Sequence, residues 1–100
     1  MAQHNDHGRI AEAIAQNYLR TRGLTTITTN YHCRYGELDL VMRDGNVLVI
    51  AEIRYRRHTA FVGPVDSVSP AKRRRIARAA MHFRQRHPAC RHHAVRLDIL

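Results

Sequence analysis

The sequence contains no run of apolar residues long enough to cross a membrane. A membrane-spanning helix needs about 20 consecutive apolar residues, and the apolar stretches of this 100-residue chain are much shorter. The first residues, Met1 to Asp6, also lack the apolar centre of a secretory signal peptide. We therefore expect a cytoplasmic protein with no membrane partner.

Cysteine is scarce as well, because the chain has only Cys33 and Cys90. Two such widely separated cysteines do not make a disulfide framework, so we expect free thiols. Zinc is also disfavoured. Structural zinc sites use two groups of closely spaced ligands, whereas Cys90, His92 and His93 form one loose group.

Acidic residues and lysine are both rare in the second half of the chain. Residues 1–50 carry five basic and five acidic side chains and residues 51–100 carry twelve and three, so the second half holds the whole net charge of +9. Lys72 is the only lysine, and the other cations are arginines, which bind phosphate in a bidentate manner. The expected partner is nucleic acid. A genome rich in arginine codons would raise the arginine content too, but would not concentrate the charge in one half.

Two carboxylates lie within apolar segments that are typical of β-strands. Asp39 is flanked by Leu38 and Leu40, and Glu52 follows a run of Val, Leu, Ile and Ala. The turn at residues 44–46 contains an Asp-Gly pair that favours a hairpin, which brings Asp39 beside Glu52. Burying carboxylates is costly without a compensating cation. Hard oxygen ligands suit Mg²⁺ or Mn²⁺, so this pair predicts a divalent-metal site.

Strand periodicity assigns faces to these residues. Because residues two apart share a face, we expect one face of each strand to carry the acids, with the two sets Glu37, Asp39, Val41 and Ile50, Glu52, Arg54; Leu38, Leu40 and Met42 take the opposite face. The alternative is a solvent-facing sheet on which Glu and Arg form an ordinary cross-strand ion pair.

The remaining pattern predicts a helix over 6–22, strands over 25–33, 37–43 and 47–55, a second helix over 70–87 and a last strand over 95–100. Gly23 ends the first helix, and Ser69 with Pro70 begins the second. We expect the first helix to bury a stripe of Ile10, Ala13, Ile14, Asn17 and Tyr18, and the second to bury Ile76, Ala77, Ala80, Met81 and Phe83.

This order of elements predicts one α/β domain over residues 1–100 with a mixed central sheet. The last strand reaches the final residue, which leaves open a continuation of the domain beyond Leu100. Residues 56–69 form a basic connection, interpreted either as a substrate clamp or as a simple loop.

The combination of Glu12 in an opening helix, Gly36-Glu37-Leu38-Asp39-Leu40, Glu52-x-Arg54 and Ser-Pro-Ala-Lys at 69–72 resembles the YraN-type uncharacterised protein family. That family resembles Holliday-junction resolvases and restriction-endonuclease-like nucleases. The resemblance covers nearly the whole chain and implies a three-layer restriction-endonuclease-like fold. It also implies a homodimer, by analogy with resolvases that make two symmetric cuts.

The resemblance further implies a reaction and a site. Asp39 and Glu52 would be metal ligands, assisted by the Ile53 carbonyl and by Glu12, and Glu37 would be a signature residue near the site. The reaction would be Mg²⁺- or Mn²⁺-dependent, structure-selective cleavage of phosphodiester bonds. The nucleic-acid backbone would contact cations before and along the second helix, namely Arg56, Arg57, Lys72, Arg74, Arg75 and Arg78.

Arg54 departs from the resembling nucleases, which carry lysine two residues after the second acid. Lysine can lose a proton when it is desolvated, whereas arginine stays charged. Arg54 can therefore stabilise negative charge in a catalytic role but cannot act as a base. The first hypothesis is an endonuclease, and the second is a catalytically silent nucleic-acid-binding protein on the same fold. A ribosome-associated basic protein is less favoured because it leaves the strand acids unexplained.

Overall fold

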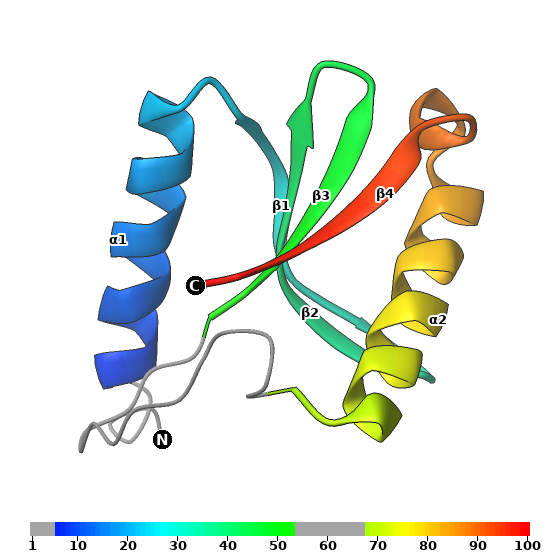
Figure 1. Ribbon diagram of the computed structural model, residues 1–100, viewed down its shortest axis with the longest axis horizontal. Helices are drawn as coiled ribbons and strands as arrows, with labels where there is room; N and C mark the ends of the chain where they lie inside the picture. The colour runs from blue at the N-terminus through cyan, green and yellow to red at the C-terminus, as the bar shows by residue number, and fades with distance from the viewer. Residues whose placement is uncertain (1–5, 54–67) are drawn as a thin grey trace.

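Four strands form one mixed sheet between two helices (Figure 1). A computed structural model describes residues 6–53 and 68–100. Along the chain the elements are α1 (Asp6–Thr21), β1 (Thr25–Cys33), β2 (Gly36–Asp44), β3 (Val47–Glu52), α2 (Pro70–Arg86), the short 3-10 helix η3 (Pro88–Cys90) and β4 (Ala94–Ile99). All four strands and both long helices predicted from the sequence are confirmed, with ends that differ by a few residues.

The sheet order is β1-β2-β3-β4. The first three strands are antiparallel neighbours, and β4 pairs in parallel with β3. The parallel pair requires a crossover, and α2 lies within it on one side of the sheet while α1 lies on the other (Figure 1). The domain is therefore an α/β sandwich of three layers, compatible with a restriction-endonuclease-like fold. Neither helix in the described ranges has the length and hydropathy needed to cross a bilayer.

Local sequence signals explain the ends of the elements. After α1, Gly23 has φ of 93° and the N–H of Leu24 donates to the Leu19 carbonyl, an arrangement that ends the helix and buries both leucines. The β2–β3 hairpin turns through Gly45, whose φ of 62° suits a tight two-residue turn. Ser69 caps α2 by accepting a hydrogen bond from the Lys72 N–H at 3.1 Å.

The core lies on both faces of β2 and β3. The α2 side is built from Leu38, Val41, Leu48, Ile50, Val68, Ile76, Ala79, Ala80, Phe83 and Cys90. The α1 side is smaller and consists of Leu19, Leu24, Leu40, Met42, Val49 and Ala51. Cys33 and Cys90 are free thiols, as predicted.

The predicted buried stripe of α1 is wrong. Its large apolar members are exposed, with exposed fractions of 58% for Ile10, 64% for Ile14 and 50% for Tyr18, and Ala13 and Asn17 are exposed too. The helix instead packs Ala15 and Leu19 against the core, and Gln16 beside them accepts a hydrogen bond from Thr26 of β1. For α2, the burial of Ile76, Ala80 and Phe83 is confirmed, whereas Ala77 and Met81 are exposed and Ala79 takes their place.

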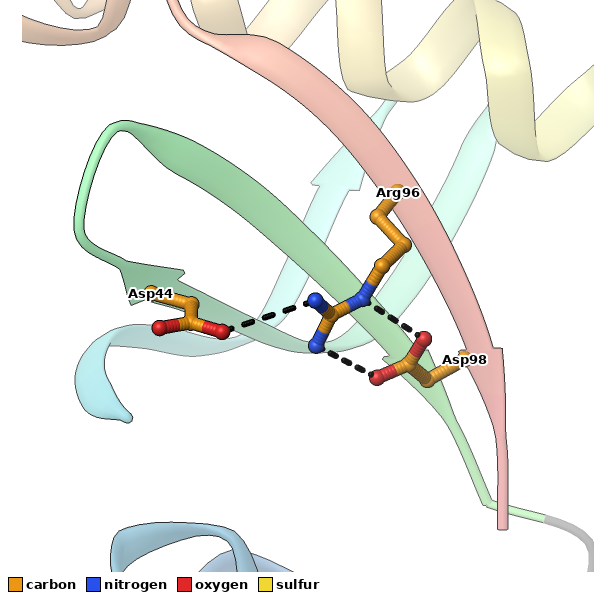
Figure 2. A network of polar contacts seen from close by, with 3 residues as sticks. All are labelled: Asp44, Arg96 and Asp98. Atoms are coloured by element: carbon orange, nitrogen blue, oxygen red, sulfur yellow. Dashed lines mark hydrogen bonds and ion pairs between the residues drawn. The ribbon is translucent and has the colours of Figure 1, made fainter. Parts of the chain in front are cut away.

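An ion-pair network holds β4 against the hairpin turn. The Arg96 guanidinium binds both carboxylate oxygens of Asp98, at 3.0 and 3.1 Å, and reaches Asp44 at 3.5 Å (Figure 2). The hydrogen bonds to Asp98 and Asp44 raise the pKa of Arg96 above its ordinary value. The network joins β2 to β4 at the end of the hairpin remote from Asp39, about 17 Å away at the usual rise of a strand.

Candidate metal and phosphate site

The pairing of β2 with β3 stops at Leu40 and Ala51, and the two strand acids meet one residue beyond that pair. The N–H of Asp39 donates to Glu52 Oε2 at 3.2 Å, and the N–H of Ile53 donates to Asp39 Oδ2 at 2.9 Å. Each carboxylate therefore accepts a backbone donor from the neighbouring strand, in place of the main-chain ladder. The structure brings Asp39 and Glu52 together, as the hairpin predicts.

Glu52 is the more buried acid, with an exposed fraction of 3%. Burial, together with the nearby charge of Asp39, raises the pKa of Glu52 from 4.5 to about 7, although the Asp39 N–H and Lys72 oppose the rise. On its main chain, the Glu52 carbonyl accepts the N–H of Leu100 at 2.9 Å. Negative charge on Glu52 is therefore costly without a nearby cation.

The chain has an unusual conformation around Asp39. Asn30 lies in β1 between the residues that pair with Leu38 and Leu40, and its φ of 51° is in the left-handed region. Leu38 packs on the α2 side while Leu40 packs on the α1 side, although residues two apart in a regular strand share a face. The predicted common face of Leu38, Leu40 and Met42 is therefore wrong for Leu38, because the strands change direction at this point.

Two cavities border Asp39 as a result. The smaller, of about 160 Å³, lies toward α2 and is lined by Gly36, Glu37, Asp39, Glu52, Lys72, Arg75 and Ile76. The larger, of about 470 Å³, lies toward α1 and is lined by Gly8, Arg9, Glu12, Asn30, His32, Glu37, Asp39 and Ile53. Glu37 borders both and forms an exposed ion pair with His32 at 3.4 Å.

Glu12 faces the larger cavity but does not join the acidic pair. Its carboxylate accepts a hydrogen bond from the Asn30 side chain at 3.2 Å. Within residues 6–53 and 68–100, no group of three His, Cys, Asp or Glu side chains is close enough together to hold a metal ion. The predicted ligands that lie together are Asp39, Glu52 and the main chain at Ile53.

The predicted cations of α2 divide into two sets. Lys72 and Arg75 line the smaller cavity, and Lys72 Nζ lies 4.0 Å from Glu52 Oε1. Arg74 and Arg78 are exposed on the same helix but outside that cavity. The predicted roles of Arg54, Arg56 and Arg57, and the proposed clamp around them, fall on residues 54–67, which lie outside the described residues.

A divalent cation fits the donor set on chemical grounds. Two carboxylates provide hard oxygen ligands, one of them is buried, and the cation that pairs with it stands at 4.0 Å rather than at hydrogen-bond distance. Bringing such an ion to the pair would offset the cost of two adjacent negative charges.

Sequence reasoning missed two features of this site. The sequence pattern places Asn30 only within a β-branched strand, although asparagine tolerates the left-handed conformation better than most residues and is a signal of an irregular position. The charge of the helix predicts only backbone binding for Lys72. The capping signal of Ser69 does not indicate how close the Lys72 side chain comes to Glu52.

The fold and site define a class of small α/β domain in which two carboxylates, one of them buried, meet where the pairing of the two central strands stops, beside a basic helix. Within that class, the model of the uncharacterised protein family UPF0102 matches residues 11–100, and the chain belongs to this family. The predicted resemblance to the YraN-type uncharacterised family is thereby confirmed.

Individual relatives agree with this assignment. The chain is similar to a UPF0102 protein of Nitrosococcus oceani, with 44% identity over 99 residues that cover 99% of this chain and 80% of the relative. It is similar to one of Stutzerimonas stutzeri, with 43% identity over 100 residues that cover 100% and 83%. A third, of Methylobacillus flagellatus, is 46% identical over 93 residues that cover 91% and 82%.

Proposed function

We propose that this protein is a divalent-metal-dependent, structure-selective endonuclease that hydrolyses phosphodiester bonds in nucleic acid. The observation that carries the proposal is the almost complete burial of Glu52 directly beside Asp39. Two adjacent carboxylates in this position weaken a fold unless they serve a cation. A basic helix borders the same cavity, so a polyanion can approach the acids.

Asp39 and Glu52 would hold Mg²⁺ or Mn²⁺, with the Ile53 carbonyl as a further oxygen ligand. Glu12, across the larger cavity, would act from farther away. The bound ion would supply an acidified water and neutralise charge on the phosphate. Ile53 is already held at the acids because its N–H donates to Asp39.

The reaction would be a hydrolysis. The water oxygen bonds to phosphorus, the P–O3′ bond breaks, the 3′ oxygen takes a proton and the proton of the water passes to solvent. The residues of this chain would position the phosphate and stabilise its added negative charge, in which Arg54 takes part as a permanent cation. Lys72, Arg74, Arg75 and Arg78, together with Arg56 and Arg57, would bind the flanking backbone.

The resolvase analogy extends the proposal to DNA as substrate and to a homodimer as the working unit, in the cytoplasm. These parts rest on the resemblance and on the uneven charge of the chain. A dimer would place two acidic pairs on one branched substrate.

A cleavage panel tests the proposal. Labelled four-way junctions, flaps and single strands, in DNA and RNA, are incubated with Mg²⁺ or Mn²⁺ and either wild-type protein, Asp39→Ala or Asp44→Ala. Asp44 is the matched control because it is the last residue of the same strand, about 17 Å from Asp39 at the usual rise of a strand. Wild type and Asp44→Ala should cut at least one substrate and Asp39→Ala none. Failure of the wild type on the whole panel would overturn the proposal.

A second candidate is a catalytically silent nucleic-acid-binding protein. It is favoured by Arg54, which stands where the resembling nucleases carry lysine. Such a protein would bind the same substrates with equal affinity in the presence of a chelator and in the presence of Mn²⁺. A nuclease should instead gain affinity from the metal, and lose that gain in Asp39→Ala.

A further inference from the structure

Lys72 is held at the acidic pair from a separate element. It lies in the first turn of α2, where its N–H donates to the Ser69 side chain at 3.1 Å. Its side chain is 35% exposed, whereas the side chain of Glu52, 4.0 Å away, is 4% exposed. The backbone of Lys72 is therefore fixed by the helix cap, while its long side chain spans the distance between solvent and a buried carboxylate.

Lys72 has a particular electrostatic position. Across the part of the chain that the structure describes, it is the only cation that forms an ion pair with Asp39 or Glu52. Its ammonium has three donors and no acceptor, and at 4.0 Å it does not make a short hydrogen bond with Glu52. Donors thus stay available for a second negative group in the same cavity.

The cavity has space for that group. It measures about 160 Å³ and also receives Arg75, so two cations and three acids line it. A water molecule takes about 30 Å³ in the liquid, so a phosphate group that displaces a few waters fits beside Lys72. A dication on the acids would repel the Lys72 ammonium from Glu52 and leave it close to any phosphate bound there.

We propose that Lys72 exchanges one negative partner for another: it neutralises Glu52 in the free protein and contacts the scissile phosphate when a divalent cation occupies the acids. This inference rests on the proposed function. It places a lysine at the scissile phosphate in a chain that has arginine, rather than lysine, at position 54. It also gives Lys72 a role different from that of the α2 arginines, which would bind the flanking backbone phosphates. Lys72 is then a catalytic residue that also competes with the metal.

If Lys72 exchanges partners in this way, one substitution at position 72 should raise the affinity for Mn²⁺ and lower kcat. Lys72→Met removes the competitor, so Mn²⁺ should bind the free protein about fivefold more tightly, the size expected for one partly exposed ion pair. The same variant loses a donor to the phosphate, so kcat should fall about a hundredfold or more, as on removal of one donor to a developing oxyanion. A lysine that only binds the backbone would raise KM and leave Mn²⁺ affinity unchanged.

The experiment compares wild type, Lys72→Met, Lys72→Arg and the control Arg86→Met. Arg86 ends the same helix and its removal changes the net charge equally, but it lies about 21 Å along the axis from Lys72. Mn²⁺ binding is measured without nucleic acid, by electron paramagnetic resonance of the free ion, and kcat and KM are measured on the substrate that the cleavage panel selects. Lys72→Arg should return Mn²⁺ affinity to the wild-type value and recover part of kcat.

The outcomes separate this inference from the proposed function. If wild type binds Mn²⁺ and cuts, but Lys72→Met leaves either Mn²⁺ affinity or kcat unchanged, the exchange is wrong and the nuclease stands. Equal gains in Mn²⁺ affinity for Lys72→Met and Arg86→Met would reduce the effect to net charge and also overturn it. If wild type neither binds Mn²⁺ nor cuts, the proposed function fails and the exchange fails with it.

Discussion

Asp39, within β2, and Glu52, the last residue of β3, are joined by a hydrogen bond from the Asp39 N–H to the Glu52 carboxylate. The bond fixes the direction of a buried acid, and the Ile53 N–H fixes the direction of Asp39 in the same way. Neither bond supplies a full counter-charge. The pair is therefore preorganised for a cation, and the free protein carries the cost of holding it.

The stability of the metal-free protein should depend on the charge of Glu52. The pKa of Glu52 is about 7 in the fold, above the ordinary 4.5. The contribution of the neutral carboxyl to the stability of the fold is therefore complete below about pH 4.5 and is lost as pH rises through 7. Glu52→Gln keeps an acceptor for the Asp39 N–H without the charge. The excess of its unfolding free energy over that of wild type should grow by about 2 kcal/mol between pH 5 and pH 8, measured by urea denaturation in a chelator.

Mg²⁺ provides the complementary measurement at pH 8. It should stabilise wild type and leave Glu52→Gln nearly unchanged. If Mg²⁺ stabilises the two proteins equally, Glu52 is not a ligand. If the difference in unfolding free energy between Glu52→Gln and wild type does not vary with pH, the negative charge of Glu52 does not destabilise the fold.

The sequence predicts those parts of the fold that depend on local chemistry. The hairpin follows from Asp44-Gly45, and the start of α2 from Ser69 and Pro70, because turns and caps are determined within a few residues. The acidic pair then follows from hairpin register, since Asp39 and Glu52 lie opposite each other one step beyond Leu40 and Ala51. These are short-range relationships, and the structure confirms them.

Long-range packing was not predictable in the same way. Helical spacing identifies Ile10, Ile14 and Tyr18 as one apolar stripe, but it cannot say that the neighbouring strand presents polar groups such as Thr26 and Asn30. The side of α1 that faces the sheet therefore carries polar side chains beside Ala15 and Leu19, and the predicted apolar stripe is exposed. The contact between Lys72 and Glu52 likewise depends on how α2 crosses the sheet.

The Ser69 cap of α2 should contribute to the stability of the fold. Ser69→Ala removes the side-chain acceptor of the Lys72 N–H and should lower the free energy of unfolding by about 1 kcal/mol. Ser69→Asp, which retains a cap, should stay close to wild type. Chemical denaturation measures both, and equal stability of Ser69→Ala and wild type would show that the cap contributes nothing here.

The exposed arginines of α2 should affect binding rather than chemistry. Arg74→Ala or Arg78→Ala should weaken nucleic-acid binding and reduce the slope of log affinity against log salt by about one, because each removes one phosphate contact. Fluorescence anisotropy at several salt concentrations gives the slope. Arg20→Ala, a change of equal charge in α1, is the control. A slope that falls equally in the control would contradict a specific role for the α2 surface.

Position 54 should set the rate of the reaction. Arg54→Lys supplies a side chain that can release a proton when it is desolvated, so kcat should rise on the substrate that wild type cuts. Single-turnover rates across a range of pH measure this. A rate equal to or below that of wild type would show that arginine at this position is not the limiting departure.

Mn²⁺ binding to the free protein tests the acidic pair most directly. Titration of wild type, Asp39→Asn and the control Asp44→Asn, followed by the resonance of unbound Mn²⁺, requires no substrate. The proposal predicts saturable binding to wild type and to Asp44→Asn, with at least a tenfold loss in Asp39→Asn, about the cost of removing one charged ligand. Binding that is absent from wild type, or equal in all three proteins, would contradict it.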